Sequence, residues 1–266
     1  MNPVTTDRIL VHVADGIGWL TLNNPERRNA ISLEMWHGIG AALEAFQHDA
    51  AVRVAVIRGA GGKAFASGAD ISEFDQHRAN AEQRKQYTAA GALGHEWLRR
   101  FDKPLLALIE GFCIGGGLVV ALCADVRFAT PASRFAIPAA KLGLGYEYSG
   151  VAALARLIGP SATRDLLFSA RLIEADEALR LGLINFVVAG DEIEAKVRSY
   201  AQAIAANAPL TIRAAKAAVA AFEHPPLTEA TEARVRALVD ACFDSEDYAE
   251  GRRAFAEKRP PKFRGR

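Results

Sequence analysis

Residues 110–118 read Glu-Gly-Phe-Cys-Ile-Gly-Gly-Gly-Leu, directly after the apolar residues 105–109. The apolar run predicts a short buried strand, and the glycine triplet opens an apolar stretch that predicts a helix to about Cys123. Glycines at a strand-to-helix transition expose backbone N–H groups at the positive end of the helix dipole. The segment fits either close packing of the helix on a sheet or the binding of a phosphate or an oxyanion. It lacks the P-loop and GxGxxG patterns, which disfavours a Rossmann-type dehydrogenase.

A second loop of small residues lies upstream, at 64–71, and reads Ala-Phe-Ala-Ser-Gly-Ala-Asp-Ile. It follows a predicted buried strand over 52–58 and a Gly-Ala-Gly-Gly turn. Small side chains let a ligand approach the backbone, and Gly68 permits unusual dihedral angles. Amide N–H groups in such a bend can point at an anion or a carbonyl oxygen. Taken alone, the segment is more typical of a surface loop in which Asp70 caps a turn.

The rest of the chain alternates strands and helices and then becomes helical. Residues 8–13 and 17–22 predict a hairpin around Asp15-Gly16. Ser32 is the expected N-cap of an amphipathic helix, and a polar helix is expected over about 78–101. Further predicted elements are strands at 126–129 and 185–188 and helices at 192–206, 210–222, 228–243 and 245–258. This order predicts an α/β core packed against a helical C-terminal part.

Composition excludes several classes of protein. The 266 residues carry 32 Lys and Arg against 31 acids, so no global field favours nucleic acid as a partner. The longest uncharged run, 111–124, is shorter than the roughly 20 residues of a membrane-spanning helix. No secretory signal is visible at the N-terminus. Three widely spaced cysteines without a CxxC pair indicate buried reduced thiols, no metal site and a cytoplasmic protein.

The two glycine-containing loops together resemble those of the crotonase superfamily, also called the enoyl-CoA hydratase/isomerase family. Residues 65–74 are similar to its first oxyanion loop and residues 111–125 to its second. Asn24-Pro25 with Asn29-Ala30-Ile31-Ser32 resembles an early motif of the family. Later signatures match residues 173–188 and 207–216, so the resemblance covers nearly the whole chain.

The resemblance implies an α/β fold of the crotonase type, a spiral of ββα units over residues 1–195. A helical trimerisation region over 196–266 would form homotrimers or dimers of trimers. The implied substrate is an acyl-CoA thioester whose carbonyl oxygen lies between the N–H groups of Ala69 and Gly116. Coenzyme A enters as part of the substrate, so no cofactor or metal is expected. The residues that the resemblance places around coenzyme A are Arg28, Ser67, Gly68, Asp70, Ile71 and Gly115.

Both glutamates of the family's hydratases are replaced. Val119 and Ala139 stand at the matching positions, and neither side chain can activate water. Glu147 matches the position where several family isomerases carry a single acidic base. One base suffices to take a proton from one carbon and return it to another. The alternative is that Glu147 is a solvated loop acid.

The resemblance therefore favours an enoyl-CoA isomerase in which Ala69 and Gly116 hold the enolate oxygen and Glu147 moves the proton. Tyr146 matches a tyrosine of the family's methylmalonyl-CoA decarboxylases, as do residues 244–248, but those enzymes carry a histidine where this chain has Ala69. Hydration by an unusual route also fits the family, and so does a CoA-binding homologue without catalytic activity. Basic residues at Arg27-Arg28 and along 252–266 are either solvated or meet the phosphates of coenzyme A.

Overall fold

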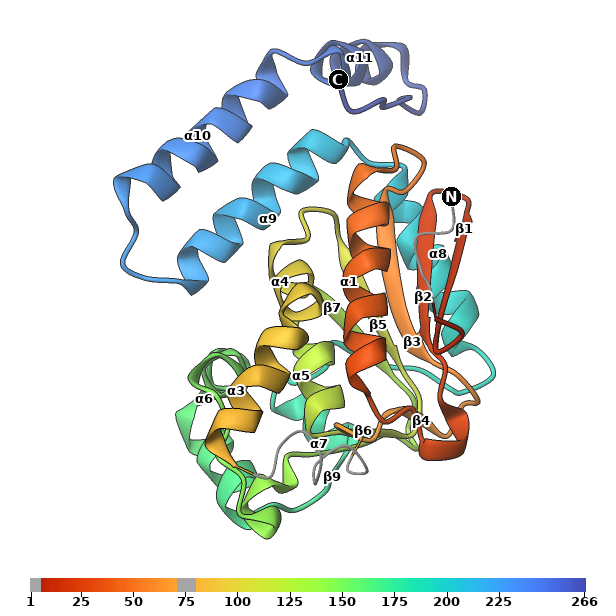
Figure 1. Cartoon of the computed structure of the whole chain (residues 1–266). Coiled ribbons are helices and arrows are strands. Elements are labelled where there is room, and N and C mark those ends of the chain that lie inside the picture. Colours follow the sequence, from red (N-terminus) through yellow and green to blue (C-terminus); the bar gives the residue numbers. More distant parts are fainter. Residues whose placement is uncertain (1–5, 71–79) are drawn as a thin grey trace.

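In the described part of the chain, residues 6–70 and 80–266 of a computed structural model, six strands form one sheet (Figure 1). Their order across the sheet is β1-β2-β3-β5-β7-β10. β1 and β2 form the predicted antiparallel hairpin, and the other neighbours pair in parallel. The bounds are β1 (Ile9–Ala14), β2 (Ile17–Leu22), β3 (Val54–Gly59), β5 (Leu105–Ile109), β7 (Val126–Ala129) and β10 (Phe186–Val187).

Helices cover both faces of this sheet. Alternate strand residues such as Leu20 and Ile57 join a core with α1 (Leu33–His48), whose Ser32 accepts the N-cap hydrogen bond as predicted. The intervening residues, such as Trp19 and Val56, pack on α8 (Ile193–Ala205). Because side chains alternate across a strand, a sheet covered on both faces has fully buried strands, as β2 and β5 are.

A second, smaller sheet lies near one end of the first (Figure 1). Its order among the described residues is β4-β6-β8-β9, with bounds β4 (Ala64–Ala66), β6 (Phe112–Ile114), β8 (Arg134–Ala136) and β9 (Ile173–Glu174). The pairs β3/β4, β5/β6 and β7/β8 each supply one strand to each sheet. The α5 helix (Gly116–Leu122) follows β5 and β6, and the 3-10 helix η3 (Pro138–Leu142) and α6 (Tyr148–Ser169) follow β7 and β8. This is the predicted spiral of ββα units.

The predicted helix over 78–101 is two helices in the described residues, α3 (Ala81–Ala90) and α4 (Ala92–Arg100). They meet at Gly91, which lies close to Trp36 of α1. A Cβ atom on Gly94 would come within 2.4 Å of the Trp36 carbonyl oxygen, so α4 packs against the backbone of α1. Residues 78 and 79 lie outside the described part of the chain.

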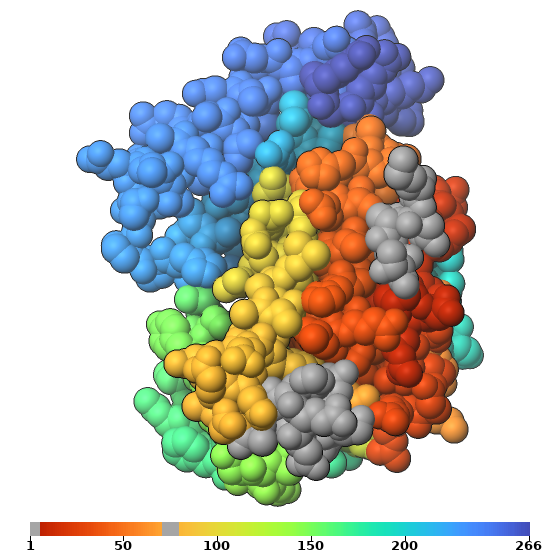
Figure 2. Space-filling view, in the orientation of Figure 1, coloured from red at the N-terminus to blue at the C-terminus, as the bar shows by residue number. Residues whose placement is uncertain are grey.

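The C-terminal helices extend away from the sheets, as the blue ribbons of Figure 1 and the blue surface of Figure 2 show. After α7 (Ala175–Arg180) and α8 come α9 (Pro209–Glu223), α10 (Glu229–Phe243) and α11 (Glu246–Glu257). The predicted domain boundary between residues 195 and 196 falls inside α8, which packs on the central sheet. The helices beyond α8 are the part that stands apart from the core.

Candidate active site

The loop after β4 is held in an extended form by the segment 28–31. Ser67 N donates to the Arg28 carbonyl at 3.0 Å, and Ile31 N donates to the Gly68 carbonyl at 2.8 Å. Asp70 N donates to the Ile31 carbonyl at 3.0 Å. These bonds all join the loop to the segment 28–31. Because the C=O and N–H of one trans peptide point in opposite directions, and the Gly68 carbonyl faces Ile31, the Ala69 N–H points away from that segment.

The early Asn24 and Asn29 motif fixes this arrangement. The buried Asn29 side chain donates from Nδ2 to the carbonyls of Ala60 and Ala64 at 2.9 and 2.7 Å. Its Oδ1 accepts from Asn24 N at 2.9 Å, and Asn24 Nδ2 donates to the Ala30 carbonyl at 3.0 Å. Buried amides that satisfy loop carbonyls in this way hold the loop backbone in one position.

The glycine triplet brings the start of α5 against this loop. Gly115 has φ 54° and ψ −118°, a conformation that essentially requires glycine, and its N–H donates to the Ala136 carbonyl at 2.8 Å. A Cβ atom on Gly117 would lie 2.4 Å from the Ala66 carbonyl oxygen, so no larger residue fits. The close packing expected of the triplet is therefore present, and it brings the start of α5 to the first loop.

The Ala69 and Gly116 amides border the same small space. A Cβ atom on Gly116 would lie 3.4 Å from Ala69 N, and one on Gly68 would lie 3.8 Å from Gly116 N. Gly116 is the first residue of α5, so its N–H has no carbonyl one helical turn earlier to bind. Two amide donors, one of them at a helix N-terminus, form an arrangement that can stabilise negative charge on an oxygen atom.

Tyr146 lies beside this pair of amides. Its hydroxyl is 3.7 Å from the position that a Cβ atom would take on Gly115, and its half-buried ring packs against the main core. A Cβ atom on Gly150 would lie 3.7 Å from both the Tyr146 ring and a Val119 methyl group. Tyr146 therefore lies next to the amides, and Val119, three residues after Gly116 in α5, shares with the Tyr146 ring the contact to Gly150. Ala139, which stands at the position of the second hydratase glutamate, is buried on η3.

The structure places Glu147 at the N-cap of α6, directly after Tyr146. Its side chain is 64% exposed and forms an ion pair with Arg84 of α3. Arg84 is not among the residues that the sequence predicts for the site. The two residues are 63 positions apart, so only the fold brings them together.

The residues predicted to surround coenzyme A lie around the first loop. The Arg28 guanidinium is exposed and lies 5.0 Å from the Phe112 ring centroid. The Ser67 hydroxyl donates to the Arg27 carbonyl at 3.2 Å, and the buried Asp70 carboxylate accepts from Arg27 Nη1 at 2.9 Å. Both side chains therefore help to hold the loop that carries Ala69. Gly68 and Gly115 lie at the contact between the two loops, and Ile71 lies outside the described residues.

Other titratable groups near the two sheets fit structural roles. Burial raises the pKa of the Cys113 thiol in β6 and raises the pKa of Cys123 to about 11, so both stay protonated at neutral pH. All three cysteines are free, as predicted, but only Cys113 is fully buried, whereas Cys123 and Cys242 are half-buried. Burial also raises the pKa of Glu110, a carboxyl group in the field of Arg58 and of Glu194 on α8.

Three arginines of the basic C-terminal tail pair with acids of α11. Arg259 pairs with Glu250 at 2.6 Å, as does Arg253, and Arg266 pairs with Glu246 at 3.1 Å. The Arg259 hydrogen bonds hold the pKa of the Glu250 carboxyl well below its usual range. These contacts give the tail cations a structural role within the chain.

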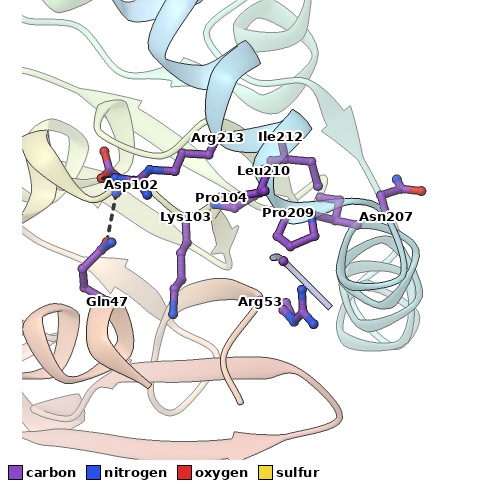
Figure 3. Close-up of a pocket in the computed structure, with 12 residues that line it drawn as sticks. Gln47, Arg53, Asp102, Lys103, Pro104, Asn207, Pro209, Leu210, Ile212 and Arg213 are labelled. Atoms are coloured by element: carbon purple, nitrogen blue, oxygen red, sulfur yellow. Dashed lines mark hydrogen bonds and ion pairs between the residues drawn. The ribbon is translucent and has the colours of Figure 1, made fainter. Parts of the chain in front are cut away.

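The tail also reaches a cavity of about 200 Å³ between α9 and the core (Figure 3). Three cations border it, and each has a protein partner: Arg53 the Phe263 carbonyl, Lys103 the carbonyls of Phe46 and Asp49, and Arg213 the Asp102 carboxylate. No described residue that lines the cavity belongs to the loops of Ala69 and Gly116. The cavity lies where the C-terminal helices contact the core.

Across residues 6–70 and 80–266, no group of three or more His, Cys, Asp or Glu side chains is placed to hold a metal ion. In the same residues, every helix is too short or too polar to cross a membrane.

Comparisons with known proteins agree on one family. The model of the enoyl-CoA hydratase/isomerase family matches residues 12–266. The chain is 34% identical over 260 residues to a crotonyl-CoA hydratase of Syntrophomonas wolfei, covering 97% of this chain and 98% of the relative. It is 34% identical to a carnitinyl-CoA dehydratase of Salmonella enteritidis, covering 93% and 94%. Among solved structures, an enoyl-CoA hydratase/carnithine racemase of Magnetospirillum magneticum matches with 40% identity and a TM-score of 0.91, covering 98% and 97%.

Proposed function

Because this chain belongs to the enoyl-CoA hydratase/isomerase family, we propose that it moves the double bond of an enoyl-CoA thioester by means of a single base. The family resemblance and the crotonase-type fold that the sequence predicted are thereby confirmed, as is an enzyme of this family acting on an acyl-CoA. The choice of isomerisation over hydration or decarboxylation is our proposal.

The observation that carries the proposal is the composition of the space around the two amides. The Ala69 and Gly116 N–H groups border it, and Val119, one helical turn after Gly116 in α5, stands where the family's hydratases carry a carboxylate. A 3-enoyl-CoA bound with its thioester oxygen on the two amides loses a proton from C2, and the negative charge collects on that oxygen. The proton then returns to C4, which restores the thioester carbonyl and leaves the double bond between C2 and C3.

Glu147 is the proposed base, and the Tyr146 hydroxyl lies beside the amides. Glu147 follows Tyr146 in the chain, at the start of the helix whose Gly150 contacts Val119 and the Tyr146 ring. One carboxylate that accepts the C2 proton and returns it to C4 is sufficient for an isomerase. Coenzyme A is part of the substrate, and the proposed chemistry calls for no cofactor. The cytoplasmic location stays a prediction.

Hydration is the second candidate, since two of the similar proteins are named as a hydratase and a dehydratase. It requires a group that activates water, and neither Val119 nor Ala139 can do so. The two reactions leave different products, because isomerisation conserves the mass of the thioester whereas hydration adds one water molecule.

The test is to incubate the protein with a short-chain 3-enoyl-CoA. We expect the absorbance of a conjugated 2-enoyl thioester to rise and the product to keep the mass of the substrate. A product heavier by one water molecule, or tight binding without turnover across a panel of thioesters, would contradict the isomerase proposal. A 2-enoyl-CoA incubated in parallel reports hydration directly through loss of the same absorbance.

We also propose that the chain forms homotrimers or dimers of trimers through its C-terminal helices. Large apolar side chains are exposed there, among them Phe222 on α9 at 87% and Phe243 on α10 at 61%. Such side chains normally become covered in an assembly. Light scattering of the purified protein should give three or six times the chain mass of 28.6 kDa. A monomer at micromolar concentration would contradict the assembly.

A further inference from the structure

Arg84 and Glu147 form an ion pair between α3 and the start of α6. Figure 1 shows these two helices next to each other, at the end of the molecule away from the C-terminal helices. The side chains remain 40% and 64% exposed. Ion pairs as exposed as this one contribute little to folding stability. Stabilisation of the fold therefore does not account for the contact.

The other charged and titratable groups around Glu147 come from η3, from α3 and from the chain neighbours of Glu147. On η3, which packs against α6, the charged residue is Lys141. The α5 helix also packs against α6, and its sequence Gly-Gly-Leu-Val-Val-Ala-Leu has no titratable side chain. On α3, Glu82 and Lys85 pair with each other at 3.9 Å. Tyr146 and Tyr148 flank Glu147 in the chain. Arg84 is therefore the cation that the described structure places in contact with the carboxylate.

A catalytic carboxylate at the edge of an acyl site has a specific difficulty. It must be ionised to accept a proton, but bound substrate excludes water and favours the protonated, neutral form. A cation held against the carboxylate opposes this effect because it stabilises the ionised form. The ion pair supplies such a cation from a different element of the fold.

We propose that Arg84 is a positioning residue that holds the Glu147 carboxylate ionised and oriented at the edge of the acyl-CoA site. The inference rests on the proposed role of Glu147 as the base. Arg84 has no direct part in the proton transfer. It acts through Glu147, so its removal changes the pH range in which the enzyme works.

The test is the pH profile of kcat/KM for Arg84→Gln. Loss of the cation makes protonation of the carboxylate easier, so the acid limb of the profile should move to higher pH by about one unit. Arg84→Lys keeps the charge and should restore most of the wild-type limb. Lys85→Gln removes the neighbouring cation on α3 and is the matched control, with no shift expected. All three variants should keep thermal midpoints within about 3 °C of wild type.

A superimposable acid limb in Arg84→Gln would overturn the inference, as would a uniform loss of activity at every pH. Glu147→Gln, measured in parallel, separates this failure from that of the proposed function. If Glu147→Gln is inactive and Arg84→Gln has an unshifted limb, only the role of Arg84 is wrong. If Glu147→Gln is fully active, the proposed base itself is wrong.

Discussion

Gly116→Ala should lower kcat/KM for an enoyl-CoA by about 10²–10³-fold while leaving the fold intact. The added methyl group would lie 3.4 Å from Ala69 N, in the space that both amides border. The thioester oxygen then cannot reach its donors. Loss of one oxyanion donor typically costs about 2.7–4 kcal/mol in transition-state stabilisation. Alanine favours a helix start more than glycine does, so the thermal midpoint should not fall.

Gly190→Ala is the matched control for this substitution. A Cβ atom on Gly190 would meet only a Thr130 methyl group, at the ordinary distance of 3.9 Å. We expect wild-type kcat/KM and wild-type stability for this variant. Wild-type kcat/KM in Gly116→Ala would show that the amide pair does not hold the thioester oxygen.

Glu147→Gln should lower kcat for isomerisation by about 10²–10⁴-fold, the usual contribution of a general base. Glutamine has nearly the same shape and can still accept a hydrogen bond from Arg84, but it cannot take up a proton. Binding of acyl-CoA should therefore persist, which calorimetry with a non-reactive saturated thioester would measure. The loss should appear in kcat far more than in the dissociation constant.

The control for Glu147→Gln is Glu82→Gln, which removes another exposed carboxylate that pairs with a cation on α3. We expect activity within twofold of wild type, since Glu82 has no part in the proposed proton transfer and an exposed ion pair contributes little to stability. If the two variants were equally active, Glu147 would be a solvated acid, as its residue type alone suggests.

Much of the fold was predictable because its main strands and helices are long enough to show a period. The hairpin, the helix capped by Ser32 and the buried strand at 105–109 all occur as expected. The strands β4, β6, β8 and β9 contain only two or three residues each, so no alternation is visible in them. The break of the 78–101 helix at Gly91 depends on how closely α4 packs against Trp36, which is a tertiary contact.

The candidate site was likewise predictable only in part. The two small-residue loops were predicted as partners, and the structure brings the Ala69 and Gly116 amides to one space. Local sequence did not reveal that Ser67 and Asp70 bind the segment that carries Arg27. It also did not reveal that Arg84 pairs with Glu147, because their contact exists only once α3 and α6 are folded. Charged partners far apart in sequence carry no periodic signal.

The most direct test of the account is nuclear magnetic resonance of a 3-enoyl-CoA turned over in D₂O by the wild-type protein and by Glu147→Gln. The account predicts that the wild type moves the double bond from C3–C4 to C2–C3 without adding oxygen, and that Glu147→Gln leaves the substrate unchanged over the same time. A 3-hydroxyacyl product from the wild type, or an equally fast double-bond shift in Glu147→Gln, would contradict it.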